Sequence, residues 1–440
     1  MPFAAALSEH PITAYAVGEA CGEVLEQIGP HPDLVLVFTT LAHAGALEDV
    51  VGAVEAVLHP SVAVAAASAS VIGTGREVEG GPAVSLWAGR WGPVLPIRVA
   101  AGGGITTAGT TASTPASLPT ASLPTAGLPT AGAPASDLST GVPFSPTALL
   151  LVGDPYSVRA TELLAVVAGR YPGLPVVGGM AAGARGPGGT RLALDNKVHT
   201  TGAVGALLGP GVDVVSVVSQ GCRPIGRPYV VTAGVGEIVR ELAGRPALGR
   251  LEQLAASLTP AEIRSINNGG LYLGRVLDER KADFGPGDFV VRPVLGGDRQ
   301  TGAIAVSTEM AGSDVVSIGV VGPEMAGSQV GASDVVEVGT TVQFHLRDGV
   351  GAHEDLDGLL SRAAPRAEAE AAWLFTCSGR GRRLFGVDNH DAGLLAERVG
   401  RVPTIGFLAD GELGPAAGRK DLRSSSASVL LLREHRSGAR

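Results

Sequence analysis

Lysine and aromatic side chains are scarce in this 440-residue chain. The only lysines are Lys197, Lys281 and Lys420, and aromatic residues make up 4% of the sequence, so the core must be built from Val, Leu, Ile and Ala. Acidic residues outnumber basic ones by 42 to 33, which leaves a net charge of −9. With that charge balance, neither a nucleic acid nor an anionic membrane surface is an expected partner.

Cysteine is also rare, since Cys21, Cys222 and Cys377 are far apart and form no C-x2-C pair. This pattern indicates neither a disulfide framework nor a zinc site, and it favours a reduced, cytoplasmic location. The N-terminus MPFAAALSEHP lacks the basic and apolar regions of a signal peptide. The longest apolar stretch, 61–73, is too short to span a bilayer, so membrane insertion is not expected.

Several common enzyme motifs are missing as well. The chain has no Walker A, HExxH or GxSxG motif, and GVGEIV (234–239) lacks the third glycine of a dinucleotide-binding turn. The nine histidines are dispersed, and His43, His199, His345 and His390 have no second ligand at metal-site spacing. No metal site is therefore predicted, although a histidine bound to haem iron stays open as an alternative.

Glycine, with 64 residues, is abundant, and the length predicts two or more domains. Residues 101–146 are rich in Ala, Thr, Ser and Pro and contain the repeat ASLPT–ASLPT–AGLPT (116–130). Such a segment buries too little apolar surface to offset its ordering entropy, so we expect a disordered insertion. A tandem duplication in 308–338 predicts a second insertion, in a surface loop.

Three stretches of the chain repeat one order of elements, namely strand, loop, helix, strand, glycine-rich turn and strand. The predicted units have strands at 33–38, 61–67 and 83–89 around a helix at 46–58; strands at 148–153, 174–179 and 202–209 around a helix at 157–170; and strands at 371–376, 402–407 and 427–432 around a helix at 389–399. Continuous apolar strands on either side of one helix are typical of right-handed βαβ crossovers.

The region 210–360 between the second and third units has a different pattern. Its strands predict an antiparallel α+β region, with a helix that starts after Arg245–Pro246 and ends near 257. The predicted fold class is therefore α/β, with repeated strand-helix-strand-hairpin units that form two lobes and an intervening α+β antiparallel region.

The stretch FTCSGRGRRLFG (375–386) places a thiol and three arginines directly after a predicted strand. The next strand of that unit is followed by LADGELGPAAG (408–418), which carries Asp410 and Glu412. Both loops open at the carboxyl ends of parallel strands, where α/β sheets bind ligands. Arginines and backbone N–H groups on one side and acids on the other predict a site for a small anion or zwitterion. The alternative is that these arginines are only solvated, or paired to Glu412, Asp388 or Asp391.

Cys377 and Arg383 also have the C-x5-R spacing of tyrosine-phosphatase loops. Thr376 stands in place of the usual preceding histidine and Leu384 in place of the usual hydroxyl residue, and no general-acid motif is present. A thiol-dependent enzyme that uses Cys377 is therefore an alternative to a binding module.

Several motifs in order resemble the N-terminal and C-terminal parts of the FIST domain, over about residues 20–435. They are GREVEGGPAVSLWAG (75–89), GCRPIGRPYVVT (221–232), LDERKADFGPGDFVVRPVLGGDRQTGAIAV (277–306), VGTTVQFHLRD (338–348), CSGRGRRLFG (377–386) and GFLADGELGP (406–415). The resemblance divides the chain into a FIST N-terminal domain at 20–209 and a C-terminal domain at 210–435.

The resemblance implies a sensory, signal-transduction module that binds small ligands such as amino acids, with some haem-binding members. We therefore expect a cytoplasmic, non-catalytic bacterial sensor without nucleic-acid or membrane partners. The chain has no fused output domain, so its signalling partner protein is expected to act in trans. The predicted ligand-binding residues are Cys377, Gly379, Arg380, Gly381, Arg382, Arg383 and Glu412.

Overall fold

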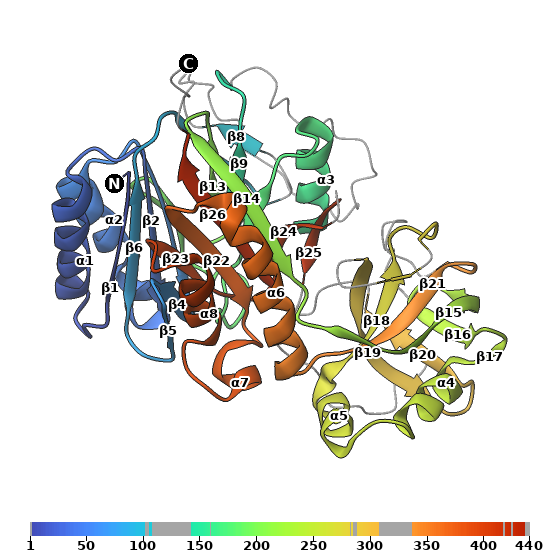
Figure 1. The fold of residues 1–440 in the computed structure, drawn as a ribbon. Helices are drawn as coiled ribbons and strands as arrows, with labels where there is room; N and C mark the ends of the chain where they lie inside the picture. The colour runs from blue at the N-terminus through green and yellow to red at the C-terminus, as the bar shows by residue number, and fades with distance from the viewer. Residues whose placement is uncertain are drawn as a thin grey trace, which may run out of the picture.

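The computed structural model describes residues 2–101, 105–107, 142–158, 160–281, 283–284, 288–307, 337–416, 419–423 and 426–435. Most of the two predicted insertions, 101–146 and 308–338, lies outside these residues. Figure 1 shows two lobes, a large one of sheets covered by helices and a smaller one of antiparallel strands.

The large lobe contains the three predicted units and their edge strands. Its strands are β1 (Phe3–Ser8), β2 (Leu34–Thr40), β3 (Val62–Ser68), β4 (Ser70–Gly73), β5 (Arg76–Glu79), β6 (Val84–Gly89), β7 (Val94–Val99), β8 (Ile105–Thr107), β9 (Ala148–Gly153), β10 (Val176–Met180), β11 (Leu192–Leu194), β12 (Lys197–His199), β13 (Ala203–Leu208), β14 (Val212–Ser219), β22 (Ala371–Cys377), β23 (Thr404–Ala409), β24 (Glu412–Ala416), β25 (Arg419–Arg423) and β26 (Ala427–Glu434). Its helices are α1 (Thr13–Ile28), a 3₁₀ helix (Leu41–Ala46), α2 (Leu47–Leu58), α3 (Ala160–Arg170), α6 (Gly349–Ala367), α7 (Gly381–Phe385) and α8 (His390–Val399).

These strands form three separate sheets of the same design. The orders are β1-β6-β2-β3-β11-β12, then β8-β7-β13-β9-β10-β24-β25, and β14-β26-β22-β23-β4-β5. In each sheet one parallel pair, β2/β3, β9/β10 or β22/β23, is flanked by antiparallel strands. The predicted α/β fold class with strand-helix-strand-hairpin units is confirmed.

The hairpin of each unit leaves its own sheet and joins a neighbouring one. The β4–β5 hairpin of the first unit pairs with β23, β11–β12 of the second pairs with β3, and β24–β25 of the third pairs with β10. The three units are therefore linked in a closed cycle, and each sheet is completed by residues from a distant part of the sequence.

The inner faces of the three sheets share one apolar core. It includes alternate residues of β2, β9 and β22, the first strand of each parallel pair, such as Phe38, Val152 and Phe375. Phe38, Phe375 and Phe407 meet edge to face at centroid distances of 5.0 to 5.9 Å. The helices cover the outer faces, with α1 and α2 on the first sheet, α3 on the second, and α6 and α8 on the third (Figure 1).

The smaller lobe is a closed barrel. It contains β15 (Arg223–Val235), β16 (Ile238–Leu242), β17 (Arg245–Pro246), α4 (Ala247–Ala255), α5 (Pro260–Ser265), a π-helical turn (Ile266–Gly270), β18 (Leu271–Val276), β19 (Phe289–Asp298), β20 (Ala303–Val306) and β21 (Thr341–Leu346). The strand order β15-β21-β18-β19-β20-β16 closes because β16 also pairs with β15. The predicted antiparallel region with a helix after Pro246 is present, but β14 at the start of the predicted range 210–360 belongs to the third sheet. The sequence pattern did not indicate that the strands close into a barrel.

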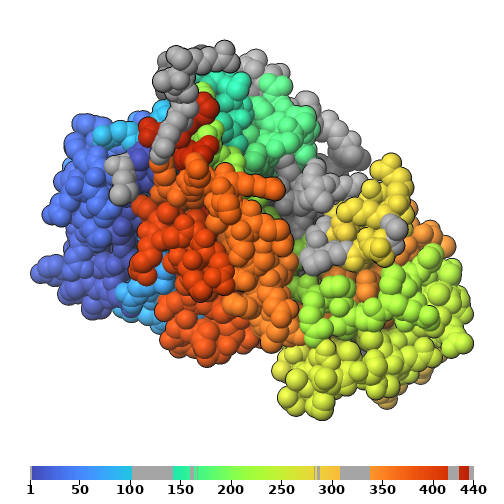
Figure 2. Space-filling model, viewed as in Figure 1, coloured from blue at the N-terminus to red at the C-terminus, as the bar shows by residue number. Residues whose placement is uncertain are grey.

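The barrel is an insertion in the third unit, between β14 and α6. In Figure 2 the orange surface of α6 lies next to the green and yellow barrel, so the third unit forms the junction of the lobes. The division into sequence domains at 20–209 and 210–435 stays a prediction, distinct from these lobes. Within the described part of the chain, no helix has the length and apolar character needed to cross a membrane.

Candidate functional site

The loop after β22 turns sharply at the edge of the third sheet. The N–H of Arg380 donates to the Cys377 carbonyl at 2.8 Å, and the N–H of Ser378 donates to the Ala409 carbonyl at 2.7 Å. The N–H of Gly379 points at the Cys377 sulfur at 3.4 Å. These bonds hold the loop against the end of β23, so the two predicted ligand loops do lie side by side.

Gly381 is required where α7 begins. Its φ of 57° is left-handed, and a Cβ there would lie 2.6 Å from a carboxylate oxygen of Glu79. The same Glu79 carboxylate accepts the N–H of Arg382 at 2.9 Å. A glycine therefore lets an acid of the β4–β5 hairpin approach the first turn of α7.

Arg380 is fully buried and forms an ion pair with Asp391 at the start of α8. Its Nε and Nη2 donate to the two carboxylate oxygens at 2.7 and 2.9 Å. Burial alone would raise the pKa of Asp391, but the Arg380 charge and a hydrogen bond with His390 bring this pKa down to about 2. The guanidinium also lies 5.1 Å from the centroid of the Phe385 ring. Asp391 thereby holds Nε and Nη2 of Arg380 in place, and the positive charge of Arg380 is buried in the protein interior.

Glu412 is the second of the predicted site residues whose ionisable side chain is fully buried. Its Oε2 accepts the Ser426 N–H at 3.2 Å and the Ser426 hydroxyl at 2.6 Å. Burial raises the pKa of Glu412 to about 8, although Ser426 and the charge of Arg380 act in the opposite direction. Arg380 is therefore near enough to act on this carboxyl, and burial favours the protonated form of the carboxyl.

Three buried polar atoms at this strand end have no hydrogen-bond partner among the described residues: Nη1 of Arg380, Oε1 of Glu412 and Oγ1 of Thr376. Buried polar atoms are almost always hydrogen-bonded, so each of these atoms needs an explanation. A cationic donor and a carboxyl group are left unsatisfied within one neighbourhood. This is the arrangement that a bound polar molecule would complete.

The other two predicted arginines do not join this group. The side chains of Arg382 and Arg383 are exposed, and the Nε of Arg382 pairs with Asp388 at 2.5 Å. The structure thus brings together Cys377, Gly379, Arg380 and Glu412, whereas Arg382 and Arg383 face solvent. The alternative of arginines paired to nearby acids is confirmed for Arg382 with Asp388 and for Arg380 with Asp391.

Arg347, which the sequence pattern did not single out, connects the barrel to this loop. It follows β21, its Nη2 donates to the Gly379 carbonyl, and its Nη1 lies 3.5 Å from the Tyr272 hydroxyl of the barrel. A Cβ on Gly379 would lie 2.3 Å from Nη2 of Arg347. No sequence pattern linked Arg347 to Cys377, which lies 30 residues further along the chain. Arg347 reaches the loop because the barrel that it follows is inserted in the third unit.

The first unit has an equivalent strand end. Phe38 and Phe375 are each the fifth residue of their strands, β2 and β22, and both belong to the shared core, so Thr39 corresponds to Thr376. His43 is 1% exposed, and its Nδ1 lies 2.9 Å from the Thr13 hydroxyl. In the first unit, too, the segment after the first strand contains a buried nitrogenous side chain, that of His43.

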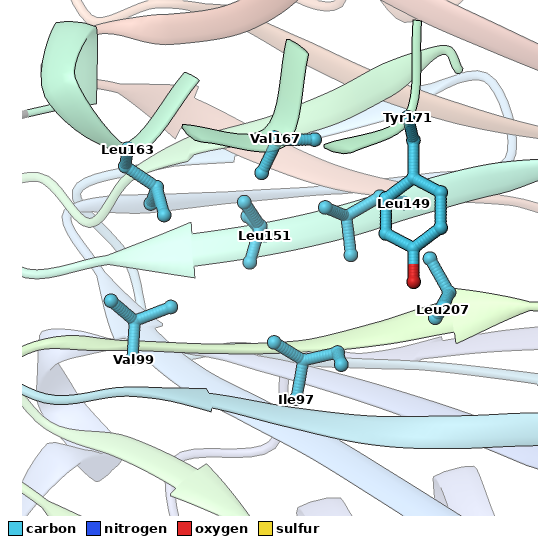
Figure 3. A pocket seen from close by; sticks show the side chains of 8 residues that line it. All are labelled: Ile97, Val99, Leu149, Leu151, Leu163, Val167, Tyr171 and Leu207. Atoms are coloured by element: carbon cyan, nitrogen blue, oxygen red, sulfur yellow. The ribbon is translucent and has the colours of Figure 1, made fainter. Parts of the chain in front are cut away.

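A separate apolar hollow lies between α3 and the outer face of the second sheet (Figure 3). It has an empty volume of about 330 Å³, partly open to solvent, and Tyr171 is the only lining residue with a polar side-chain atom. Leu163 and Val167 of α3 face Leu149 and Leu151 of β9 across it. With no charged lining residue, the hollow does not suit an anion or a zwitterion.

Comparison with known proteins agrees with this architecture. The FIST N domain matches residues 33–245 and the FIST C domain matches residues 325–415. An uncharacterized protein of Mycobacterium bovis and one of Mycobacterium tuberculosis are each 37% identical over 427 residues, which cover 96% of both chains. A second uncharacterized protein of Mycobacterium tuberculosis is 36% identical over 431 residues, or 97% of this chain and 98% of its own. The chain belongs to the FIST family, whose general attribute is a sensory role for small ligands.

Proposed function

We propose that this protein is a non-catalytic sensor whose ligand is a small zwitterion, such as an amino acid, or a small anion. The ligand binds at the strand ends of β22 and β24, between Arg380 and Glu412. The observation that carries the proposal is the pair of unsatisfied buried atoms, Nη1 of Arg380 and Oε1 of Glu412.

Each of these two atoms selects a different part of the ligand. Nη1 of Arg380 is a charged donor, and its natural partner is a carboxylate or phosphate oxygen. Glu412 is a hydrogen-bond donor while it is protonated and becomes a partner for an ammonium group once it ionises. An α-amino acid, with one carboxylate and one ammonium group, satisfies both atoms.

Ligand entry requires movement because both side chains are buried. Arg347 contacts the loop from the barrel side, so opening the site displaces the junction between the lobes. Movement at that junction changes the surface that a separate partner protein in the cytoplasm can recognise. The signalling partner is thus expected to bind near the junction.

Thermal-shift screening of the amino acids and small anions tests the proposal. A ligand at 100 times its Kd stabilises the folded protein by about 2.7 kcal/mol, which raises the melting temperature measurably. The shift caused by an amino acid should disappear in Glu412→Gln, which keeps the shape but cannot ionise, and persist in the control Arg382→Ala. If no compound raises the melting temperature of the wild type, the binding proposal fails.

The pH dependence of affinity identifies the group that faces Glu412. An amine ligand displaces the proton of Glu412, so its affinity should rise as pH increases towards 8. A ligand that presents only a carboxylate to Arg380 and Glu412 needs Glu412 in its protonated form. The affinity of such a ligand should therefore fall as pH increases towards 8. An affinity that does not vary between pH 6 and 8 would show that Glu412 is not in contact with the ligand.

A further inference from the structure

Two imidazole rings meet where α6 and α8 pack together on the outside of the third sheet. Nδ1 of His353, on α6, lies 3.0 Å from Nε2 of His390, on α8. His353 is exposed, and the side chain of His390 is 13% exposed. The two nitrogens are therefore accessible from solvent, which the site around Glu412 is not.

The orientation of His390 is fixed from two sides. Its Nδ1 lies 2.9 Å from Oδ1 of Asp391, and its ring stacks on Phe385 at a centroid distance of 3.4 Å with an angle of 8° between the planes. The Asp391 carboxylate, bound by Arg380, only accepts hydrogen bonds, so Nδ1 of a neutral His390 carries the proton. Nε2 is then left with a lone pair that faces His353.

We propose that His353 and His390 bind a divalent transition-metal ion, with Zn²⁺ as the reference ion. Zinc accepts neutral imidazole nitrogens at about 2.0–2.1 Å in tetrahedral geometry, which separates two such nitrogens by about 3.4 Å. The present separation of 3.0 Å needs only a small rotation of the exposed His353 ring. A histidine that ligates a metal typically donates its other N–H to a carboxylate, as His390 does to Asp391.

This site has two protein ligands, and water completes the coordination. Among the residues that the structure describes, no group of three His, Cys, Asp or Glu side chains is placed to share one ion. The bound metal is therefore exchangeable, in contrast to a structural zinc with four protein ligands. The site is independent of the proposed ligand site, although Asp391 contacts residues of both.

A simple hydrogen bond between the two imidazoles is the competing explanation, and His353→Gln separates the two. Glutamine can still donate a hydrogen bond to Nε2 of His390, but its amide is a poor ligand for zinc. His353 is exposed, so this change should leave the fold intact. His59→Ala is the matched control, since the rings of His31 and His59 also stack, at 5.5 Å between centroids.

The experiment is calorimetric titration of the full chain, freed of metal with a chelator, with ZnCl2 at pH 7.5. We expect one site per chain in the wild type, at least tenfold weaker binding in His353→Gln and His390→Ala, and unchanged binding in His59→Ala. Circular dichroism of each variant confirms that it is folded. The proposal is overturned by absence of heat with the wild type up to millimolar zinc, by equal affinity in His353→Gln, or by loss of binding in His59→Ala alone.

Discussion

Arg380 and Asp391 form an ion pair with two hydrogen bonds, and their side chains are 0% and 1% exposed. The arginine comes from the loop after β22 and the aspartate from the first turn of α8. The pair therefore attaches α8, the crossover helix of the third unit, to the end of β22. Neither charge could be buried alone, because the desolvation penalty of an isolated ion exceeds what packing returns.

Removal of Asp391 should therefore destabilise the large lobe strongly. We expect Asp391→Ala to lower the free energy of unfolding by about 3–5 kcal/mol, since it leaves the Arg380 charge buried without a counterion. The three tryptophans, Trp87, Trp91 and Trp373, are all in the large lobe, so their fluorescence in urea reports on that lobe. The double variant Arg380→Met/Asp391→Leu should recover much of the loss, and a double variant as unstable as the single one would contradict this explanation.

The buried carboxyl of Glu412 should make the stability of the protein depend on pH. Its pKa of about 8 in the folded protein exceeds the ordinary value of 4.5, so between these limits the folded protein keeps a proton that the unfolded chain loses. The resulting stabilisation is complete below about pH 4.5 and is lost as pH rises through 8, by at most about 1.4 kcal/mol per pH unit. Glu412→Gln cannot ionise, so its urea midpoint should fall less than that of the wild type between pH 5 and pH 8. Parallel profiles would show that Glu412 is ionised in the folded protein.

Arg347 should couple the barrel to the ligand loop. Arg347→Met keeps most of the side-chain length and removes the donor to the Gly379 carbonyl, which should cost about 1–3 kcal/mol. Hydrogen–deuterium exchange of peptides that cover 378–386 should become faster in this variant. Arg280→Met, which removes an exposed barrel arginine paired with Asp278, should leave exchange in 378–386 unchanged. Equal exchange in both variants would mean that the loop does not depend on the barrel.

Gly406 in β23 should not tolerate a side chain. A Cβ there would lie 1.6 Å from the Leu374 carbonyl oxygen of the neighbouring parallel strand, so Gly406→Ala must separate the strands. We expect a loss of about 3 kcal/mol or more, measured by urea denaturation. Gly393→Ala, in α8, is the matched control because a Cβ there has no atom within 4 Å, and it should be neutral or slightly stabilising. Similar stability of the two variants would refute the steric argument.

Much of the local structure could be predicted because it depends on short-range patterns. The helices predicted at 46–58 and 389–399 correspond to α2 (Leu47–Leu58) and α8 (His390–Val399), where apolar residues at helical spacing follow a buried strand. The helix α4 (Ala247–Ala255) begins directly after Pro246 as expected. The N-terminal pair β1 and α1 was missed, although α1 buries Ala16, Ala20 and Val24 on one face.

The site was predictable only in part, for a physical reason. A loop rich in arginine next to an acidic turn identified the neighbourhood of Arg380 and Glu412, but all three arginines carry the same local signal. Which guanidinium is buried depends on its counterion: the side chain of Asp391, in the first turn of α8, is 1% exposed, whereas that of Asp388, the partner of Arg382, is 58% exposed. Arg347 could not be placed there at all before the barrel was positioned.

Local sequence patterns were sufficient to predict most strands and helices, the threefold recurrence of one unit, and the charge of the loop after β22, because each depends on residues near one another in the chain. Three features depend on the folded chain as a whole. The hairpin of each unit pairs with the sheet of another unit, the strands of 223–306 and 341–346 close into a barrel, and Arg380 is the one arginine of its loop that is buried. These outcomes depend on contacts between residues hundreds of positions apart, such as Ser68 with Leu408, whose energies no local pattern encodes.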